Sequence, residues 1–452
     1  MTFLNYLSEK IILPGSDLLL DKSVSKNLKF LMESQWWEKE QLEEYQNTKL
    51  RKLIKHSYEN IPYYKELFSR LNLTPEDIKT KNDIYKIPVL TKDDIRKNLS
   101  NGKIIARNIS KKDLILNSSS GSTGEPLQFY ETKKSHSMWN AAGIRGWYWM
   151  GYKLGDKYIK ISQNPRSSVI KKAQDLINRS LYLYCRQLTD ENFKGIINSI
   201  NQYQPSFIRF YPDLGLFLAN YIKNNNLTVH APIAITTTGN KLFDSTRHII
   251  EEVFNCEVFD SYSSEGSAVS AECSTHNCYH TSMEYNITEI LNDGSEVKGG
   301  EKGRVITTDL FNYANPSIRY DTQDYITKSK YKCTCGRNLT AVESIDGRDS
   351  DILISPGGKL LIVHHFTVFF EWIDSVEQFQ IRQNSSDEFN FLLKVNSKYN
   401  QEAEKNIYRY WYDYIGGKIK ITINVVDDIP LTKSGKRRFL IRSQDVKLPF
   451  RF

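Results

Sequence analysis

Apolar and polar positions in the middle of this chain alternate between a strand-like and a helix-like pattern. Short apolar runs at 206–211, 231–238 and 256–260 predict strands, and amphipathic runs at 213–224 and 245–254 predict helices between them. Strands that alternate with helices in this way predict an α/β fold with a mostly parallel sheet covered by helices. Ligands of such sheets bind beyond the carboxyl ends of the strands.

The two ends of the chain have different patterns. Residues 36–68 predict helices with a break near Pro62, since proline disfavours helical geometry in the residue before it. Thr91 is expected to cap a helix, and 139–150 predict an aromatic-rich helix. From residue 359 onward, strand-like runs surround one helical run, which predicts a small α+β module. We therefore expect a large N-terminal domain, 1–348, and a small mobile C-terminal domain, 349–452, joined near 346–351.

Composition limits the possible classes of function. The chain has 452 residues, 40% of them hydrophobic and 12% aromatic, which is ample for a sizeable core. The 61 basic and 53 acidic residues give a net charge of +8, which suits anionic ligands, but the bases are spread along the chain. This spread argues against nucleic-acid binding. With no apolar run of membrane-spanning length and no signal core, we expect a cytoplasmic protein.

The stretch from Ser118 to Pro126, S-S-S-G-S-T-G-E-P, is suited to binding phosphate. Gly121 and Gly124 allow positive φ, and successive backbone N–H groups can then surround an anion. The neighbouring hydroxyls add donors. A flexible surface turn is the alternative for these nine residues taken alone.

Cysteines fall into two clusters. One reads C-S-T-H-N-C-Y-H from Cys273 to His280, and the other is Cys333-Thr334-Cys335. In a cytosolic chain such clusters favour a metal over disulfides, and tetrahedral zinc takes Cys and His ligands. Four unligated thiols are the alternative.

Further segments follow the serine- and glycine-rich stretch in a specific order: S-Y-S-S-E-G at 261–266, I-R-Y-D-T-Q-D at 318–324, Gly347-Arg348, Gly357-Gly358 and P-L-T-K-S-G-K at 430–436. In this order they resemble the adenylate-forming (acyl/aryl-CoA synthetase-like) superfamily. S-Q-W-W at 34–37, H-S-Y-E-N-I-P-Y-Y at 56–64, I-P-V-L-T-K at 87–92 and C-T-C-G-R at 333–337 resemble its phenylacetate–CoA ligase and CapK-like branch.

The resemblance implies ATP-dependent activation of a carboxylic acid as an acyl-adenylate, with release of pyrophosphate and transfer to an acceptor, CoA first among the candidates. It implies catalytic roles for Lys436, Glu265 and Arg348, and a Mg²⁺ ion on Glu265. It places ATP against the following residues: Ser119, Ser120, Gly121, Ser122, Thr123, Gly124, Thr238, Gly239, Asn240, Ser261, Tyr262, Ser263, Ser264, Asp324 and Arg348. Within this set, Tyr262 would stack near adenine and Asp324 would bind the ribose.

The resemblance also implies a structural zinc site formed by Cys273, His280, Cys333 and Cys335, with Cys278 and His276 as competitors for the second position. The chain departs from the superfamily pattern at Gln323, where glycine is usual, so the backbone beside Asp324 is expected to differ slightly. CapK-like members are commonly associated with capsule or surface-polysaccharide gene sets.

A CoA ligase of this kind would act in surface or capsular polysaccharide biosynthesis or in aryl-acid metabolism. Two alternatives are open: the acceptor is an amine, which would give an amide during polysaccharide decoration, or the protein is a non-catalytic nucleotide-binding scaffold. Pocket residues are expected within 139–152, 209–213, 236–238 and 263–268, where Arg145 and Arg209 point to a polar acid. The sequence identifies neither the acid nor the oligomeric state.

Overall fold

The computed structural model describes residues 2–118, 127–162, 166, 169–185, 190–264, 268–348, 352–358, 360–363, 366, 369–370, 373–430, 438–443 and 445–446. The described chain divides into two compact units, with the boundary between Asp346 and Gly347. No helix within these residues is long and apolar enough to cross a membrane.

The first unit begins with helices that pack on one another and on the sheet. Its helical elements are α1 (Phe3–Leu7), the π-helical turn Ser8–Ile12, α2 (Leu13–Leu20), α3 (Val24–Ser34), α4 (Lys39–Asn60), α5 (Pro62–Arg70), short 3-10 turns at Pro75–Asp77, Lys81–Lys86 and Lys111–Asp113, α6 (Lys92–Ser100), α7 (Lys133–Trp149), α8 (Val169–Ile177), α9 (Asp190–Tyr203), α10 (Pro212–Asn224) and α11 (Asp244–Phe254). The expected break at Pro62 is confirmed, because α4 ends two residues before it. Thr91 caps α6 as predicted, since its side chain accepts a hydrogen bond from the Asp94 amide.

Strands of this unit form a two-stranded ribbon and one large sheet. They are β1 (Leu114–Ser118), β2 (Gln128–Thr132), β3 (Tyr158–Ser162), β4 (Ser180–Tyr184), β5 (Phe207–Phe210), β6 (Ala234–Thr238), β7 (Glu257–Ser264), β8 (Ala268–Glu272), β9 (Tyr279–Thr281), β10 (Asn286–Asn292), β11 (Ser295–Glu296), β12 (Lys302–Asp309), β13 (Tyr320–Lys328) and β14 (Ala341–Arg348). The large sheet has the order β11-β10-β12-β13-β14-β9-β8-β7-β6-β5-β3-β4.

The α/β class is confirmed, but parallel pairing holds for only part of the sheet. Strands β4, β3, β5, β6 and β7 are parallel neighbours, whereas β7–β8, β8–β9 and the pairings around β10, β12 and β14 are antiparallel. Parallel strands need a crossover element, and among the described strands of this large sheet, helices lie between consecutive strands from β3 to β7 but not from β7 onward. The prediction of a mostly parallel sheet is therefore correct for 158–264 and wrong beyond it.

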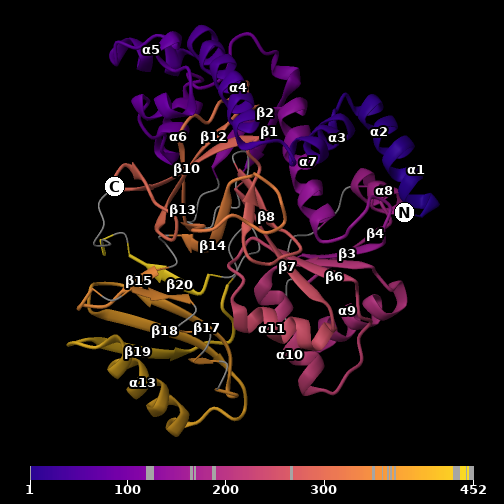
Figure 1. The fold of residues 1–452 in the computed structure, drawn as a ribbon. Coiled ribbons are helices and arrows are strands. Elements are labelled where there is room, and N and C mark those ends of the chain that lie inside the picture. The colour runs from indigo at the N-terminus through magenta and orange to yellow at the C-terminus, as the bar shows by residue number, and fades with distance from the viewer. Residues whose placement is uncertain are drawn as a thin grey trace. The chain divides into compact units, whose positions relative to one another are not determined.

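The parallel strands are covered on both faces. Their apolar side chains Ile159, Ile208, Ile235 and Val258 pack into a buried core with α9, α10 and α11 (Figure 1). The opposite face, with Phe207, Ala234 and Phe259, packs on the end of α7 and on Tyr152. A strand alternates its side chains between the two faces. Polar residues two positions from Phe207, Ala234 or Phe259 therefore lie on the same face, under α7.

The second unit is a small α+β module, as predicted. It contains β15 (Ile352–Ile354), β16 (Leu360–Ile362), β17 (Val376–Gln383), β18 (Glu388–Val395), α13 (Gln401–Ile415), β19 (Lys420–Val425) and β20 (Leu440–Arg442). A four-stranded sheet has the order β19-β18-β17-β20. Trp411 of α13 is fully buried and stacks on Phe366, 4.1 Å between ring centroids.

Candidate active site

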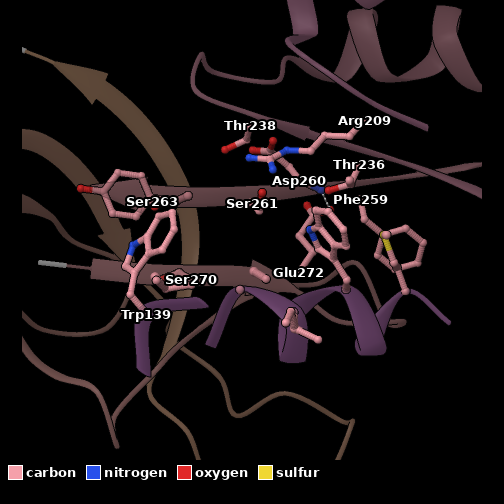
Figure 2. Close-up of a pocket in the computed structure, with 18 of the residues that line it drawn as sticks. Trp139, Arg209, Thr236, Thr238, Phe259, Asp260, Ser261, Ser263, Ser270 and Glu272 are labelled. Carbon is pink, nitrogen blue, oxygen red and sulfur yellow. Dashed lines mark hydrogen bonds between the residues drawn. The ribbon is translucent and has the colours of Figure 1, made fainter. Parts of the chain in front are cut away.

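A pocket lies between α7 and the parallel strands of the first unit (Figure 2). One helical stripe of α7, namely Asn140, Gly143, Ile144 and Trp147, forms one wall. The cavity measures about 170 Å³, and a buried cavity of roughly 150 Å³ holds a benzene molecule in another protein. Its lining residues are Trp139, Asn140, Gly143, Ile144, Gly146, Trp147, Met150, Arg209, Thr236, Thr238, Phe259, Asp260, Ser261, Tyr262, Ser263, Val269, Ser270, Ala271 and Glu272. The pocket therefore suits one small acid.

Gly146 brings α7 close to β8. A Cβ atom at this position would lie 2.8 Å from the Cβ of Ala271, which is closer than real Cβ contacts allow. The absence of a side chain at Gly146 therefore sets the distance between helix and strand at this end of the pocket.

Polar side chains from neighbouring strands face this pocket. Arg209 of β5 pairs in register with Thr236 of β6, and Thr236 pairs with Phe259 of β7. Arg209 and Thr238 also line the cavity, at the carboxyl ends of their strands (Figure 2). The Arg209 guanidinium lies over the Trp147 ring, 5.5 Å from its centroid. This edge of the pocket is cationic and rich in hydroxyls.

Asp260 lies at the junction of the pocket and the α11 side of the sheet. Its carboxylate accepts hydrogen bonds from Thr237 Oγ1 at 2.5 Å and from the Tyr279 hydroxyl at 2.9 Å, and its amide donates to Glu272 at 2.8 Å. Burial, with the nearby Glu272 charge, raises the pKa of Asp260 to about 7. Arg247 of α11 donates to Glu272 at 2.6 Å and offsets part of this negative charge.

Several residues expected to bind the nucleotide lie together beside the pocket. The Tyr262 hydroxyl donates to Asp324 Oδ2 at 2.7 Å, so the proposed adenine and ribose residues are in contact. Thr238 pairs in register with Ser261, whose hydroxyl donates to the Thr237 carbonyl. Ser263 and Ser264 complete β7. The predicted segments converge at one edge of the sheet.

The remaining predicted nucleotide residues are in part outside the described structure. Gly239 has φ +90° directly after β6, and Asn240 donates to Asp213 at 3.2 Å. Arg348 ends β14, but its side chain lies outside the described residues, as do Ser119, Ser120, Gly121, Ser122, Thr123, Gly124, Glu265 and Lys436. Their roles stay predictions.

Gln323 adopts the backbone conformation that glycine favours, with φ +64°. Its amide donates to Asp321 Oδ1 at 2.9 Å, and its side chain accepts from Lys92 at 2.7 Å. These bonds hold a non-glycine residue in a left-handed conformation next to Asp324.

Arg145 does not line the pocket, and its expected contribution to acid binding is wrong. It is fully buried on the opposite side of α7, where it donates to Glu284 Oε1 at 2.7 Å and to Ser282 at 3.0 Å. Helical spacing separates the two sides, since Ile144 and Trp147 point into the cavity. Of the two arginines considered, Arg209 is the one in the pocket.

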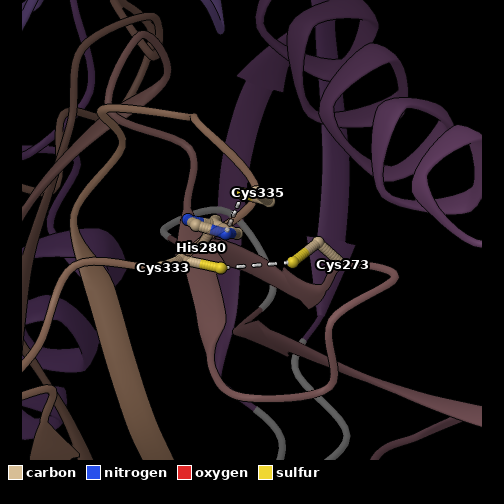
Figure 3. Close-up of side chains that lie close together, drawn as sticks. All are labelled: Cys273, His280, Cys333 and Cys335. Carbon is tan, nitrogen blue, oxygen red and sulfur yellow. Dashed lines mark hydrogen bonds between the residues drawn. The ribbon is translucent and has the colours of Figure 1, made fainter.

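The two cysteine clusters meet in space (Figure 3). The ligand atoms of Cys273, His280, Cys333 and Cys335 all lie within 4.8 Å of one another. Cys273 Sγ is 3.6 Å from Cys333 Sγ, and Cys335 Sγ is 3.2 Å from His280 Nε2. Ligands at Zn–S about 2.3 Å and Zn–N about 2.0 Å in a tetrahedron lie at roughly these separations. The donor set therefore fits zinc.

The two competitors for the second ligand differ in position. His276 lies against Phe259, with a 4.3 Å ring separation, and its Nδ1 is 3.5 Å from Glu272. Cys278 lies beside the cluster, with Sγ 3.8 Å from His280 Nε2. The geometry favours His280, with Cys278 as the neighbouring thiol.

Strand β8 is the main part of the pocket that the sequence pattern did not predict. Val269, Ser270, Ala271 and Glu272 contribute to the wall, and the segment A-V-S-A-E carries little strand preference. It becomes a strand by antiparallel pairing with β7, where Ser261 opposes Ala271. The turn-forming residues of the sequence E-G-S at 265–267 were the available signal for a hairpin.

Comparisons with known proteins agree with this geometry. Residues 353–443 match the CapK C-terminal domain family. Protein CapK from Staphylococcus aureus is 26% identical over 419 residues, which cover 88% of this chain and 89% of that protein. The phenylacetate-coenzyme A ligase of Pseudomonas putida is 26% identical over 325 residues, 70% of this chain and 72% of that enzyme. The chain is therefore similar to CapK and to phenylacetate–CoA ligases, and the resemblance expected from its motifs is confirmed.

A solved structure has the same fold as this chain. The 2-hydroxyisobutyryl-CoA ligase in its postadenylation state has a TM-score of 0.70 and 15% identity, covering 89% of this chain and 90% of that one. The expected α/β architecture with a further small α+β unit is thereby confirmed.

Proposed function

We propose that this protein activates a carboxylic acid with ATP and transfers the resulting acyl group to CoA. The observation that carries the proposal is the continuity of the pocket with the nucleotide residues. Tyr262 is one of the residues that line the cavity, and its hydroxyl donates to Asp324. An acid in the pocket and a nucleotide on Asp324 would therefore meet at the carboxyl ends of β6 and β7, where ligands of such sheets bind.

In the first step, a carboxylate oxygen attacks the α-phosphorus of ATP and pyrophosphate leaves. Asp324 accepts from the ribose hydroxyls, the Tyr262 ring packs on adenine, and the pocket holds the acid in line. Mg²⁺ on Glu265 would neutralise triphosphate charge, and the 119–124 segment would donate to the phosphates. Lys436 and Arg348 would stabilise charge on the reacting oxygens. In the second step, the CoA thiolate attacks the acyl carbon and AMP leaves.

The test is ATP–pyrophosphate exchange driven by a panel of carboxylic acids. We expect at least one acid to drive exchange, and we expect Lys436→Ala to slow it by about a hundredfold or more, since one positioned charge donor is worth that much in other enzymes. Lys433→Ala, three residues away in the same segment, is the matched control and should exchange at the parent rate. Equal exchange by the parent and Lys436→Ala would remove Lys436 from the mechanism.

The acceptor is tested separately. Acyl-AMP formed on the enzyme is mixed with CoA or with amines, and its consumption is followed. We expect a thioester. Consumption by amines alone would instead support amide formation, the alternative acceptor chemistry. A role in surface-polysaccharide synthesis is part of this proposal and rests on the similarity to CapK.

We also propose that Cys273, His280, Cys333 and Cys335 bind a structural zinc ion. The four residues come from two parts of the chain separated by more than fifty positions: Cys273 follows β8 and His280 is in β9, whereas Cys333 and Cys335 follow β13. A metal there would connect these loops and contribute to folding stability.

A further inference from the structure

We propose that the acid activated at this site carries a second anionic group, a distal carboxylate, which binds to Arg209. This inference rests on the proposed function, because it names the substrate class of the same pocket. It begins from the arrangement of charge along one face of the parallel strands.

Lys160, Arg209 and Thr236 form one row across β3, β5 and β6. Lys160 pairs in register with Arg209, and Arg209 pairs with Thr236. All three side chains are on the face that α7 covers, opposite the apolar core that contains Ile159 and Ile208. Two cations are therefore neighbours on the covered face of the sheet.

Within the described parts of the chain, no carboxylate pairs with these cations. Among the described residues, neither Lys160 nor Arg209 forms an ion pair or a hydrogen bond with an acid; each lies over an aromatic ring, Tyr182 at 5.7 Å and Trp147 at 5.5 Å. Asp175, the acid near Lys160, pairs with Arg166 at 2.9 Å. The segments 163–168 and 186–189, which follow β3 and β4, read Q-N-P-R-S-S and R-Q-L-T and contain no Asp or Glu.

Both side chains are half-buried, and partial removal from water makes an unmatched charge costly. Removal from water, with the neighbouring Arg209 and Arg166, lowers the pKa of Lys160 to about 7, and burial also lowers the pKa of Arg209. Buried charges in proteins are normally paired. An anion in the pocket would supply the missing partner, and Arg209 is the cation of this pair that lines the cavity.

The position of Arg209 also fits the far end of an acid. Thr236 and Thr238 both line the pocket, and two residues along a strand span about 6.6 Å. Thr238 is at the nucleotide end, beside Ser261, whereas Arg209 is level with Thr236. A short dicarboxylic acid spans this distance, with one carboxylate at the reacting end and the other on the guanidinium.

Pairs of acids that differ only in the distal group test the proposal. Succinate is compared with butyrate and glutarate with valerate, as kcat/KM in pyrophosphate exchange. Charge-assisted pairing predicts that the parent favours the dicarboxylate by about tenfold or more. In Arg209→Met the preference is lost or reversed, while the exposed Arg70→Met on α5 keeps it. A parent without preference, or an unchanged preference in Arg209→Met, would overturn the proposal.

A binding measurement separates this inference from the proposed function. Thermal unfolding is followed with millimolar glutarate or valerate and without ATP, in the parent and in Arg209→Met. The inference predicts a rise in the unfolding temperature with glutarate alone, and only in the parent. If no acid drives exchange, the proposed function fails, and the presence or absence of this glutarate-specific rise still decides the assignment of Arg209.

Discussion

The buried ion pair between α7 and the segment after β9 gives the most quantitative prediction. Arg145 and Glu284 are both fully inaccessible, and their closest atoms are 2.7 Å apart. Glu284 Oε1 also accepts from Ser34 of α3 at 2.7 Å, so the pair joins two helices to the sheet region. We expect Glu284→Leu to leave the Arg145 guanidinium with one hydroxyl and one carbonyl acceptor, Ser282 and Leu31.

An uncompensated buried charge of this kind costs about 3–5 kcal/mol of unfolding free energy. Replacement of both partners by apolar residues is far less costly, because it removes the charge that has lost its partner. The double variant Arg145→Met/Glu284→Leu should therefore be more stable than Glu284→Leu alone, with a coupling of about 2 kcal/mol or more.

Urea unfolding followed by tryptophan fluorescence measures this coupling. Five of the seven tryptophans lie between residues 36 and 149, so the signal reports mainly on the first unit. Trp149 itself lies next to the pair, with its ring centroid 5.2 Å from Arg145. Losses of unfolding free energy in Arg145→Met and Glu284→Leu that add up to the loss in the double variant would refute the reasoning. So would a Glu284→Leu unfolding midpoint equal to that of the parent.

Three further predictions concern other parts of the first unit. Burial raises the pKa of Asp309 to about 7, so the folded protein keeps a proton that the unfolded chain loses near pH 3.8. The parent should therefore lose stability relative to Asp309→Asn as pH rises from 4 to 7, by at most about 1.4 kcal/mol per pH unit. A difference in unfolding free energy that stays constant with pH would contradict this. Protein purified without chelator should contain about one zinc per chain by metal analysis, whereas Cys333→Ser should not; less than about half an equivalent in the parent would argue against the site. Tyr262→Phe removes the hydrogen bond to Asp324 and should raise the KM for ATP about two- to tenfold, and an unchanged KM would separate this pair from nucleotide binding.

Much of the fold could be predicted because local signals and tertiary structure agree in the parallel region. Alternating apolar runs predicted β5, β6 and α10, and Pro62 predicted the break between α4 and α5. The antiparallel strands from β8 onward were harder to predict, since no helix separates them along the chain and each is defined by its pairing with another strand. Their strand structure depends on the register of the partner, which a single sequence does not contain.

The candidate site was predictable where a motif marked it, and less so where side-chain direction decided. Tyr262 and Asp324 were predicted by resemblance, and the structure places them in contact. Arg145 and Arg209 looked equivalent as cations, yet one is bound by Glu284 and the other lines the pocket. Helix phase turns Arg145 away from the pocket, because it follows Ile144 of the pocket wall by one position, a turn of about 100°, whereas Arg209 is on strand β5.

If the pocket holds the acid, as proposed, the close approach of Gly146 to Ala271 limits how its acid preference can be altered. Any added methyl group at Gly146 would push the helix away from the strand, and that movement would also strain Arg145, one residue earlier, in its buried pair. Library designs aimed at bulkier or slimmer acids should therefore leave Gly146 unchanged and vary Trp139 and Ile144, which line the cavity and are only partly buried. Gly146 sets the spacing between helix and strand in this wall, and the other lining residues are the ones that can be substituted.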